Sequence, residues 1–156
     1  MKDAVLKLTG AVALALLFVV GASAQEKKIK KSDLPAAVQK TADEQSKGAT
    51  VKGYSTEVED GKTLYEVELT VNGHSKDVSM SPEGSVVEVE EEVVLDSLPA
   101  EVRAGLQKKA GAGKITKVES LTKQGKLVAY EAQVRTNGKK SEVQVGPDGK
   151  PLAHPE

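Results

Sequence analysis

Residues 65–73 read Tyr-Glu-Val-Glu-Leu-Thr-Val-Asn-Gly. Apolar side chains alternate with polar ones, and this period of two predicts a strand with one buried face and one face in water. The Asn72-Gly73 pair that ends the segment is the strongest short signal for a tight hairpin turn. The segment therefore predicts an antiparallel sheet with a covered apolar face and an open polar face that carries Glu66 and Glu68.

The same pattern occurs a second time in the chain. Residues 130–138 read Tyr-Glu-Ala-Gln-Val-Arg-Thr-Asn-Gly, and the Leu-Pro-Ala start at Leu34 recurs at Leu98. The Pro-x-Gly turn at Pro82 likewise recurs at Pro147. Landmarks that repeat in the same order at offsets of 64 and 65 residues indicate an internal duplication.

Each copy is predicted to be one helix followed by an antiparallel meander of three to four strands. The fold class is then α+β with two tandem repeats, residues 32–95 and 96–156. In the first helix Leu34, Val38 and Ala42 form one apolar stripe. A unit of about 60 residues is marginally stable alone, so we expect the two sheets or their edges to associate through the strand 86–95.

Residues 1–24 are predicted to be a signal peptide. Two lysines precede an apolar run at residues 8–20, and Ala-Ser-Ala at residues 22–24 supplies the cleavage site. Residues 25–31 form a charged leader, expected to be a loose arm. The mature chain is therefore expected in the periplasm or outside the cell, with membrane contact only through the signal peptide.

Composition excludes several kinds of chemistry. The 156 residues contain no Cys and no Trp, which removes disulfides, thiolate metal sites and cysteine nucleophiles. A net charge of −1 gives no reason to expect nucleic acid. Residues 25–95 hold 9 basic and 15 acidic side chains, net −6, and residues 96–156 hold 11 and 7, net +4. Opposite charges favour docking of the copies, or head-to-tail self-association of the protein.

The ordered set of landmarks resembles the PepSY family. It consists of a helix that opens with Leu-Pro, a Tyr-Glu strand, an Asn-Gly turn and a Pro-x-Gly turn. The tandem pair behind a signal peptide is most similar to the beta-lactamase-inhibitor-like branch. The resemblance covers residues 32 to about 152 and implies an α+β unit that serves in binding or inhibition in secreted and periplasmic proteins.

Four residues are candidates for contacting a protein partner. Glu66 and Glu68 lie on the predicted open face. Tyr54 has no aromatic counterpart in the second copy, which favours an exposed contact. The candidates are Tyr54, Glu66, Glu68 and Arg135. Tyr65 and Tyr130 share a face with the apolar positions and are expected at the margin of the core.

An acidic run follows in the strand 86–95. Its carboxylates, Glu88, Glu90, Glu91 and Glu92, form a weak candidate for a calcium site or a surface for a basic partner. With no EF-hand spacing present, a solvated strand face that resists aggregation is the favoured interpretation. The two histidines, His74 and His154, have no ligand spacing, and no catalytic residue or cofactor is expected.

These observations together predict an exported, non-enzymatic protein-binding module. It would bind a protein of the cell envelope and modulate or inhibit an enzyme there through the polar face of its sheets. The alternative is a periplasmic sensor or scavenger that binds a small ligand or cation through the acidic strand 88–92.

Overall fold

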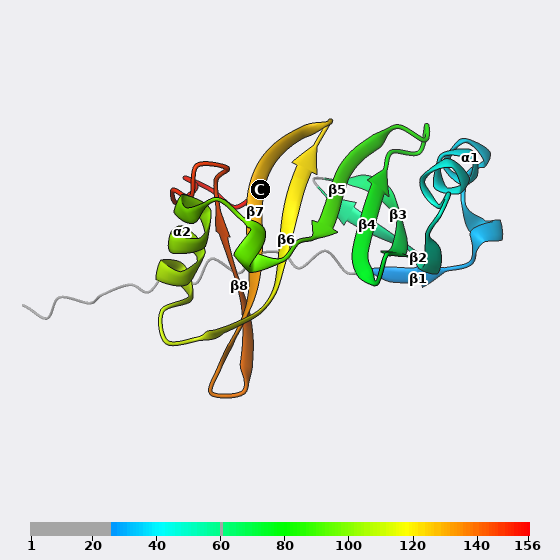
Figure 1. Ribbon diagram of the computed structural model, residues 1–156. Helices are drawn as coiled ribbons and strands as arrows, with labels where there is room; N and C mark the ends of the chain where they lie inside the picture. Colours follow the sequence, from blue (N-terminus) through cyan, green and yellow to red (C-terminus); the bar gives the residue numbers. More distant parts are fainter. Residues whose placement is uncertain (1–25, 60) are drawn as a thin grey trace, which may run out of the picture.

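The computed structural model describes residues 26–59 and 61–156. One antiparallel sheet of eight strands runs through this part of the chain, with the strands in chain order (Figure 1). The strands are β1 (Lys27–Ile29), β2 (Thr50–Glu59), β3 (Lys62–Val71), β4 (His74–Met80), β5 (Val86–Glu92), β6 (Lys114–Lys123), β7 (Lys126–Thr136) and β8 (Lys139–Val145). The helices are α1 (Ala36–Gln45) and α2 (Ala100–Ala110), preceded by short 3-10 helices at Lys31–Asp33 and Leu95–Ser97.

The prediction of two tandem repeats, each with a meander sheet of its own, is wrong. Strand β5 pairs with β6 from Glu88 opposite Lys123 to Glu92 opposite Glu119, so a single sheet passes through both halves of the chain. The expected association through the strand from Val86 is thus present as a shared ladder. Pairing satisfies the backbone N–H and C=O groups that two separate sheets would leave exposed at their edges.

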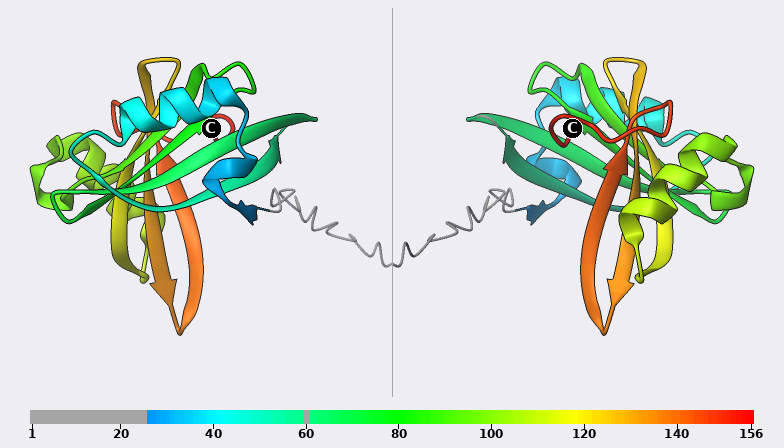
Figure 2. Two further views of the ribbon diagram at one scale, coloured as in Figure 1. Left: turned by 90° about the vertical axis from the view of Figure 1, so that its right-hand side faces the viewer. Right: turned by 90° about the vertical axis from the view of Figure 1, so that its left-hand side faces the viewer.

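The core consists of two clusters, one under each helix. In the first, Leu34, Val38 and Ala42 of the predicted helical stripe are buried against β3 and β4. In the second, Val102 and Leu106 of α2 pack against side chains of β6, β7 and β8. Tyr65 and Tyr130 are half-buried and pack against these clusters, as predicted. The helices cover one face of the twisted sheet near its two ends (Figures 1 and 2).

Each helix also contacts a glycine in a turn between strands. Gly84 follows β4 and Gly149 follows β8, and both have a positive φ, 81° and 76°. A Cβ at Gly84 would lie 2.6 Å from the carbonyl oxygen of Ala37, and one at Gly149 would overlap the carbonyl oxygen of Glu101. The two turns therefore need glycine for the backbone conformation and for the close approach of the helix backbone.

The charged leader is partly ordered, against expectation. Lys27–Ile29 forms β1, which pairs with residues 54–56 of β2. An added strand covers part of the exposed edge of β2, which explains why this segment is not a loose arm. The predicted signal peptide, residues 1–24, lies outside the described residues. Among the residues that the structure describes, no helix is long and apolar enough to cross a membrane.

Candidate functional site

The face of the sheet opposite the helices carries a large set of carboxylates. Alternation along each strand places these side chains there, because their sequence neighbours point toward the helices. We call this surface the carboxylate face. It consists of Glu66, Glu68, Asp77, Glu88, Glu90, Glu119 and Glu131.

Cross-strand register brings three of these carboxylates into one row. Glu68 of β3 lies opposite Asp77 of β4, which in turn lies opposite Glu90 of β5. Like charges that face each other across strands destabilise a sheet. A row of three acidic residues is therefore costly for the fold, and a cationic ligand would offset that cost.

Asp77 and Glu90 also approach Glu119 of β6. One carboxylate oxygen of each lies within 4.8 Å of the others, a spacing that suits a hard cation. Glu119 is only 4% exposed. The Nζ atom of Lys117 lies 2.5 Å from its Oε1 atom. A lysine ammonium therefore already supplies one positive charge to this group.

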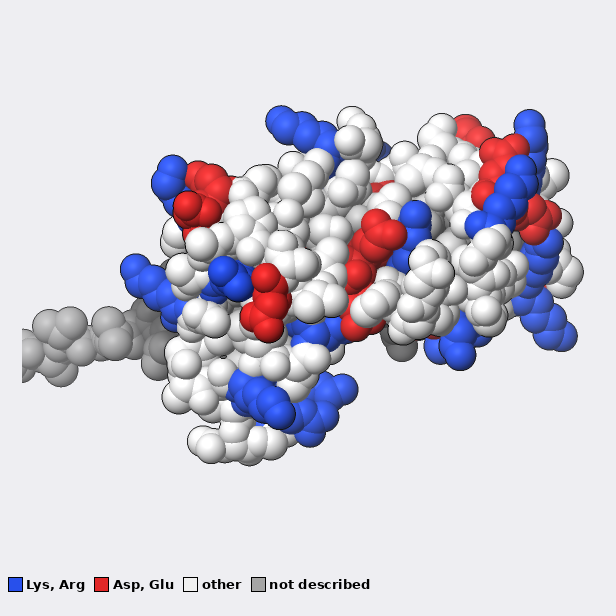
Figure 3. Space-filling view, in the orientation of Figure 1, with Lys and Arg blue, Asp and Glu red and all other residues white. Residues whose placement is uncertain are grey.

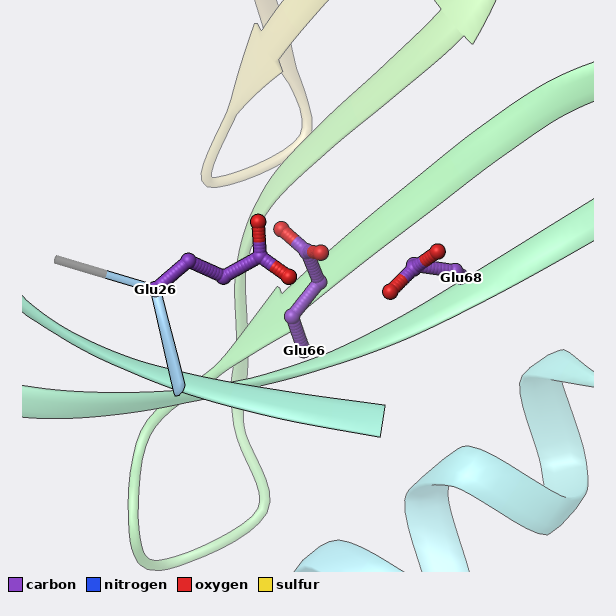
Figure 4. A group of neighbouring side chains, drawn as sticks. All are labelled: Glu26, Glu66 and Glu68. Carbon is purple, nitrogen blue, oxygen red and sulfur yellow. The ribbon is translucent and has the colours of Figure 1, made fainter. Parts of the chain in front are cut away.

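A second group of carboxylates lies toward the N-terminal edge. Glu26, Glu66 and Glu68 approach each other on the same side of the sheet (Figure 4). Gly53 leaves room for Glu68, because a Cβ there would lie only 3.1 Å from the Oε1 atom. That Oε1 atom is buried and accepts no hydrogen bond from the described residues, and the Nζ atom of Lys28 lies 3.7 Å away. The Oε1 atom of Glu68 is therefore a hydrogen-bond acceptor for which the described residues supply no donor.

Burial changes the protonation of the carboxylate face. Desolvation, reinforced by Glu119, raises the pKa of Glu90 to about 8. Desolvation and the neighbouring Asp77 raise the pKa of Glu66 to about 7. Desolvation raises the pKa of Asp77 to about 6, although Lys117 opposes the shift. These side chains are therefore partly protonated near neutral pH, and a bound cation would favour their ionised forms.

The structure brings together only some of the predicted partner-binding residues. Glu66 and Glu68 lie side by side on the carboxylate face. Arg135 is on the same face, but at the exposed far end of β7. Tyr54 lies opposite Val67, on the face toward the helices, where it is half-buried against the first core cluster. It therefore shares no surface with the two glutamates.

The acidic run at residues 88–92 does not gather into one site. Glu88 pairs with Lys123, at 3.4 Å between Oε2 and Nζ. Glu91 is exposed on the opposite face of β5. Only Glu90 of the run joins a group of three carboxylates among the described residues.

Glu92 and His74 interact at the end of the acidic strand. The backbone N–H of Ser75 donates a hydrogen bond to Glu92 over 3.0 Å, and this bond lowers the pKa of Glu92. The Nδ1 atom of His74 lies 3.7 Å from the other carboxylate oxygen. His74 is exposed, as expected for a residue beside a turn.

Sequence reasoning missed Asp77, Lys117 and Glu119. All three occupy polar positions of alternating strands, which is the signal that also indicated Glu66 and Glu68. Alternation identifies the face of a residue but not its neighbours. The pairing of β5 with β6 places Glu119 beside Glu90, and that pairing was not predicted in detail.

Removing Lys117 tests the buried ion pair. We expect Lys117→Met to lower the free energy of unfolding by about 2 to 3 kcal/mol, because a buried Glu119 loses its counter-ion. Lys123→Met is the matched control. The side chains of Lys117 and Lys123 are similarly exposed, at 25% and 29%. Their partners differ, because the side chain of Glu119 is 5% exposed and that of Glu88 is 21% exposed. The control should cost less than about 1 kcal/mol in urea denaturation, and equal losses would contradict the assignment.

Comparison with known proteins defines the fold. No protein-family model and no curated protein matches this sequence. A DUF2874 family protein from Bacteroides ovatus is 21% identical, over 76% of this chain and 84% of its own, with a TM-score of 0.59. A protein from Bacteroides eggerthii, inferred to be periplasmic, is 20% identical over 75% and 84%, with a TM-score of 0.60.

A BLIP-like protein from Bacteroides fragilis is also similar. It is 19% identical, over 74% of this chain and 81% of its own, with a TM-score of 0.54. The chain therefore has the fold that these DUF2874 and BLIP-like proteins share. The resemblance to the PepSY family stays a prediction.

Proposed function

We propose that this chain is an exported, non-enzymatic protein-binding module that acts through its carboxylate face. The partner is a protein of the cell envelope with a basic surface. The observation that carries the proposal is the acidic row of Glu68, Asp77 and Glu90 on the sheet face opposite the helices. A cationic partner would relieve the repulsion within that row.

Features of Glu68 and of the sheet support a preformed binding surface. The Oε1 atom of Glu68 accepts no hydrogen bond from the described residues. The rest of this side chain is partly exposed, and a lysine or arginine side chain of a partner would donate to the carboxylate there. The carboxylates project from paired strands, so little conformational freedom is lost when a ligand binds.

We further propose that the partner is an enzyme of the cell envelope and that this chain modulates or inhibits it. Export is supported by the predicted signal peptide and by the description of the Bacteroides eggerthii neighbour as periplasmic. The BLIP-like neighbour supports a binding role by likeness of fold. A large open sheet face suits steric blocking of another protein.

The cation-binding alternative has weaker support. Four carboxylates of the strand 88–92 would have to act together, but Glu88 pairs with Lys123, Glu92 accepts a hydrogen bond from Ser75, and Glu91 lies on the opposite face. Lys117 also stands beside Glu119, where a metal ion would have to compete with its ammonium group.

Partner capture from a periplasmic extract tests the proposal. We expect the wild-type chain to retain a basic envelope protein, and the double variant Glu66→Lys, Glu68→Lys to retain at least about fivefold less of it, because the attraction becomes repulsion. About 0.5 M salt should release the partner, since it screens the attraction between the two charged surfaces. The captured protein is identified by mass spectrometry.

The matched control reverses two acidic residues elsewhere. Glu83 and Glu101 are exposed, in the turn after β4 and on α2. The variant Glu83→Lys, Glu101→Lys has the same change in net charge and should retain the partner like the wild type. Undiminished capture by the Glu66, Glu68 variant would contradict the proposed surface. If the partner is an enzyme, adding the wild-type chain should lower or change its activity.

A further inference from the structure

A row of basic side chains lies at the other end of the sheet. Lys114 of β6, Arg135 of β7 and Lys140 of β8 face each other in register, and Lys139 lies next to them. All four are exposed, and none forms an ion pair within the described residues. Like charges in adjacent strands repel, so this row is complementary to an anionic surface.

The row lies where the β7–β8 hairpin projects from the body of the molecule. Figures 1 and 2 show the hairpin extending well beyond α2. Figure 3 shows basic side chains beside its end. Arg135 is four residues from Glu131 in β7, so it projects from the same side of the sheet as the carboxylate face. The projecting end is therefore accessible to a second molecule.

The carboxylate face carries the opposite charge. Glu66, Asp77 and Glu90 form no ion pair within the described residues. The same contrast appears along residues 25–156, with a net charge of −6 for residues 25–95 and +4 for residues 96–156. One end of the molecule therefore presents unpaired carboxylates, and the other presents unpaired cations.

A molecule cannot bring these two surfaces together by itself. Glu66 of β3 and Arg135 of β7 belong to one sheet and are separated by four strand spacings, about 19 Å. We propose that the basic row of one copy docks on the carboxylate face of a second copy, in a head-to-tail contact. This inference rests on the proposed binding role of the carboxylate face. Such a contact joins two different surfaces, leaves one of each free, and so extends into chains.

Sedimentation velocity on the mature chain tests the contact. At pH 8.5, where Glu66 and Glu90 are mostly ionised, the mean mass in low salt should rise with protein concentration, and about 0.5 M salt should return the protein to monomers. The row variant Lys114→Glu, Lys140→Glu and the face variant Glu66→Gln, Glu90→Gln should each weaken association by about tenfold or more. The control Lys108→Glu, Lys109→Glu changes two exposed lysines of α2 and should associate like the wild type.

Mixing the two deficient variants gives the sharpest result. The row variant retains an intact carboxylate face, and the face variant retains an intact basic row. An equimolar mixture should therefore form one-to-one dimers and nothing larger, because each pair has one functional contact and no free matching surface. Assemblies larger than dimers in the mixture would overturn the head-to-tail contact. Self-association of the row variant alone would overturn it as well.

Failure of this contact can be separated from failure of the proposed function. A wild-type chain that stays monomeric in low salt overturns the contact, while capture that depends on Glu66 and Glu68 would still support the binding role. A monomeric wild type that binds anionic lipid vesicles through Lys114 and Lys140 would also overturn it and assign the row to a membrane. If substitutions in the carboxylate face change neither the self-association of the protein nor the capture of the partner, both proposals are wrong.

Discussion

Replacing Gly149 by alanine is expected to lower the free energy of unfolding by about 3 to 4 kcal/mol. The φ of Gly149 is +76°, a conformation that costs alanine about 1 to 2 kcal/mol. The new Cβ would also overlap the carbonyl oxygen of Glu101 in the backbone of α2. The helix would have to shift away from the sheet, and urea denaturation measures the resulting loss.

Gly138 is the matched control for this substitution. It has a similar φ of +81°, but a Cβ there would meet no atom of residues 26–59 and 61–156 within 4 Å. Gly138→Ala should therefore cost only the strain of the backbone, about 1 to 2 kcal/mol. Gly84→Ala, with its Cβ 2.6 Å from the Ala37 carbonyl oxygen, should resemble Gly149→Ala. Equal losses at Gly138 and Gly149 would show that the close approach of α2 to the turn contributes nothing.

Acidification from pH 8.5 to pH 6 is expected to stabilise the protein by about 2 to 4 kcal/mol. The folded state raises the pKa of Glu90 from 4.5 to about 8 and that of Glu66 to about 7. Between about pH 4.5 and 8 the folded state therefore binds more protons than the unfolded state. Stability then falls as the pH rises through this window, and the full shifts are discounted because solvent partly screens these side chains.

Glu90→Gln identifies the main source of this pH dependence. Glutamine removes the charge but keeps the shape, so the variant should be more stable than the wild type at pH 8.5 by about 1 to 2 kcal/mol. Its stability should also vary less with pH. Glu91→Gln is the control, because Glu91 is exposed on the opposite face of the same strand. Stability of the wild type that rises between pH 6 and 8.5 would contradict the buried positions of these carboxylates.

Local patterns were sufficient to predict much of the local structure. The stripe of Leu34, Val38 and Ala42 is buried under α1. The Asn-Gly turns also form, with positive φ at Asn72 and Asn137. Such features depend on side-chain period and on backbone preferences over a few residues, so they can be read from a short segment.

The single sheet could not be read in this way. Residues in β5 and β6 pair across an intervening helix, and alternation says nothing about which edge a strand will join. The same limit explains the site. Glu66 and Glu68 could be named together because they lie in one strand, whereas the group of Asp77, Glu90 and Glu119 comes from three strands, and of these only Glu90 was named from the sequence. Tyr54 was assigned to an exposed contact, but its pairing with Val67 places it over the core.

The ladder between β5 and β6 has a consequence for how the protein denatures. Its five residue pairs run from Glu88 opposite Lys123 to Glu92 opposite Glu119. If either half of the chain melted, the other would lose a neighbouring strand and expose an unsatisfied edge. We therefore expect the two halves to be coupled thermodynamically and to unfold as one cooperative unit.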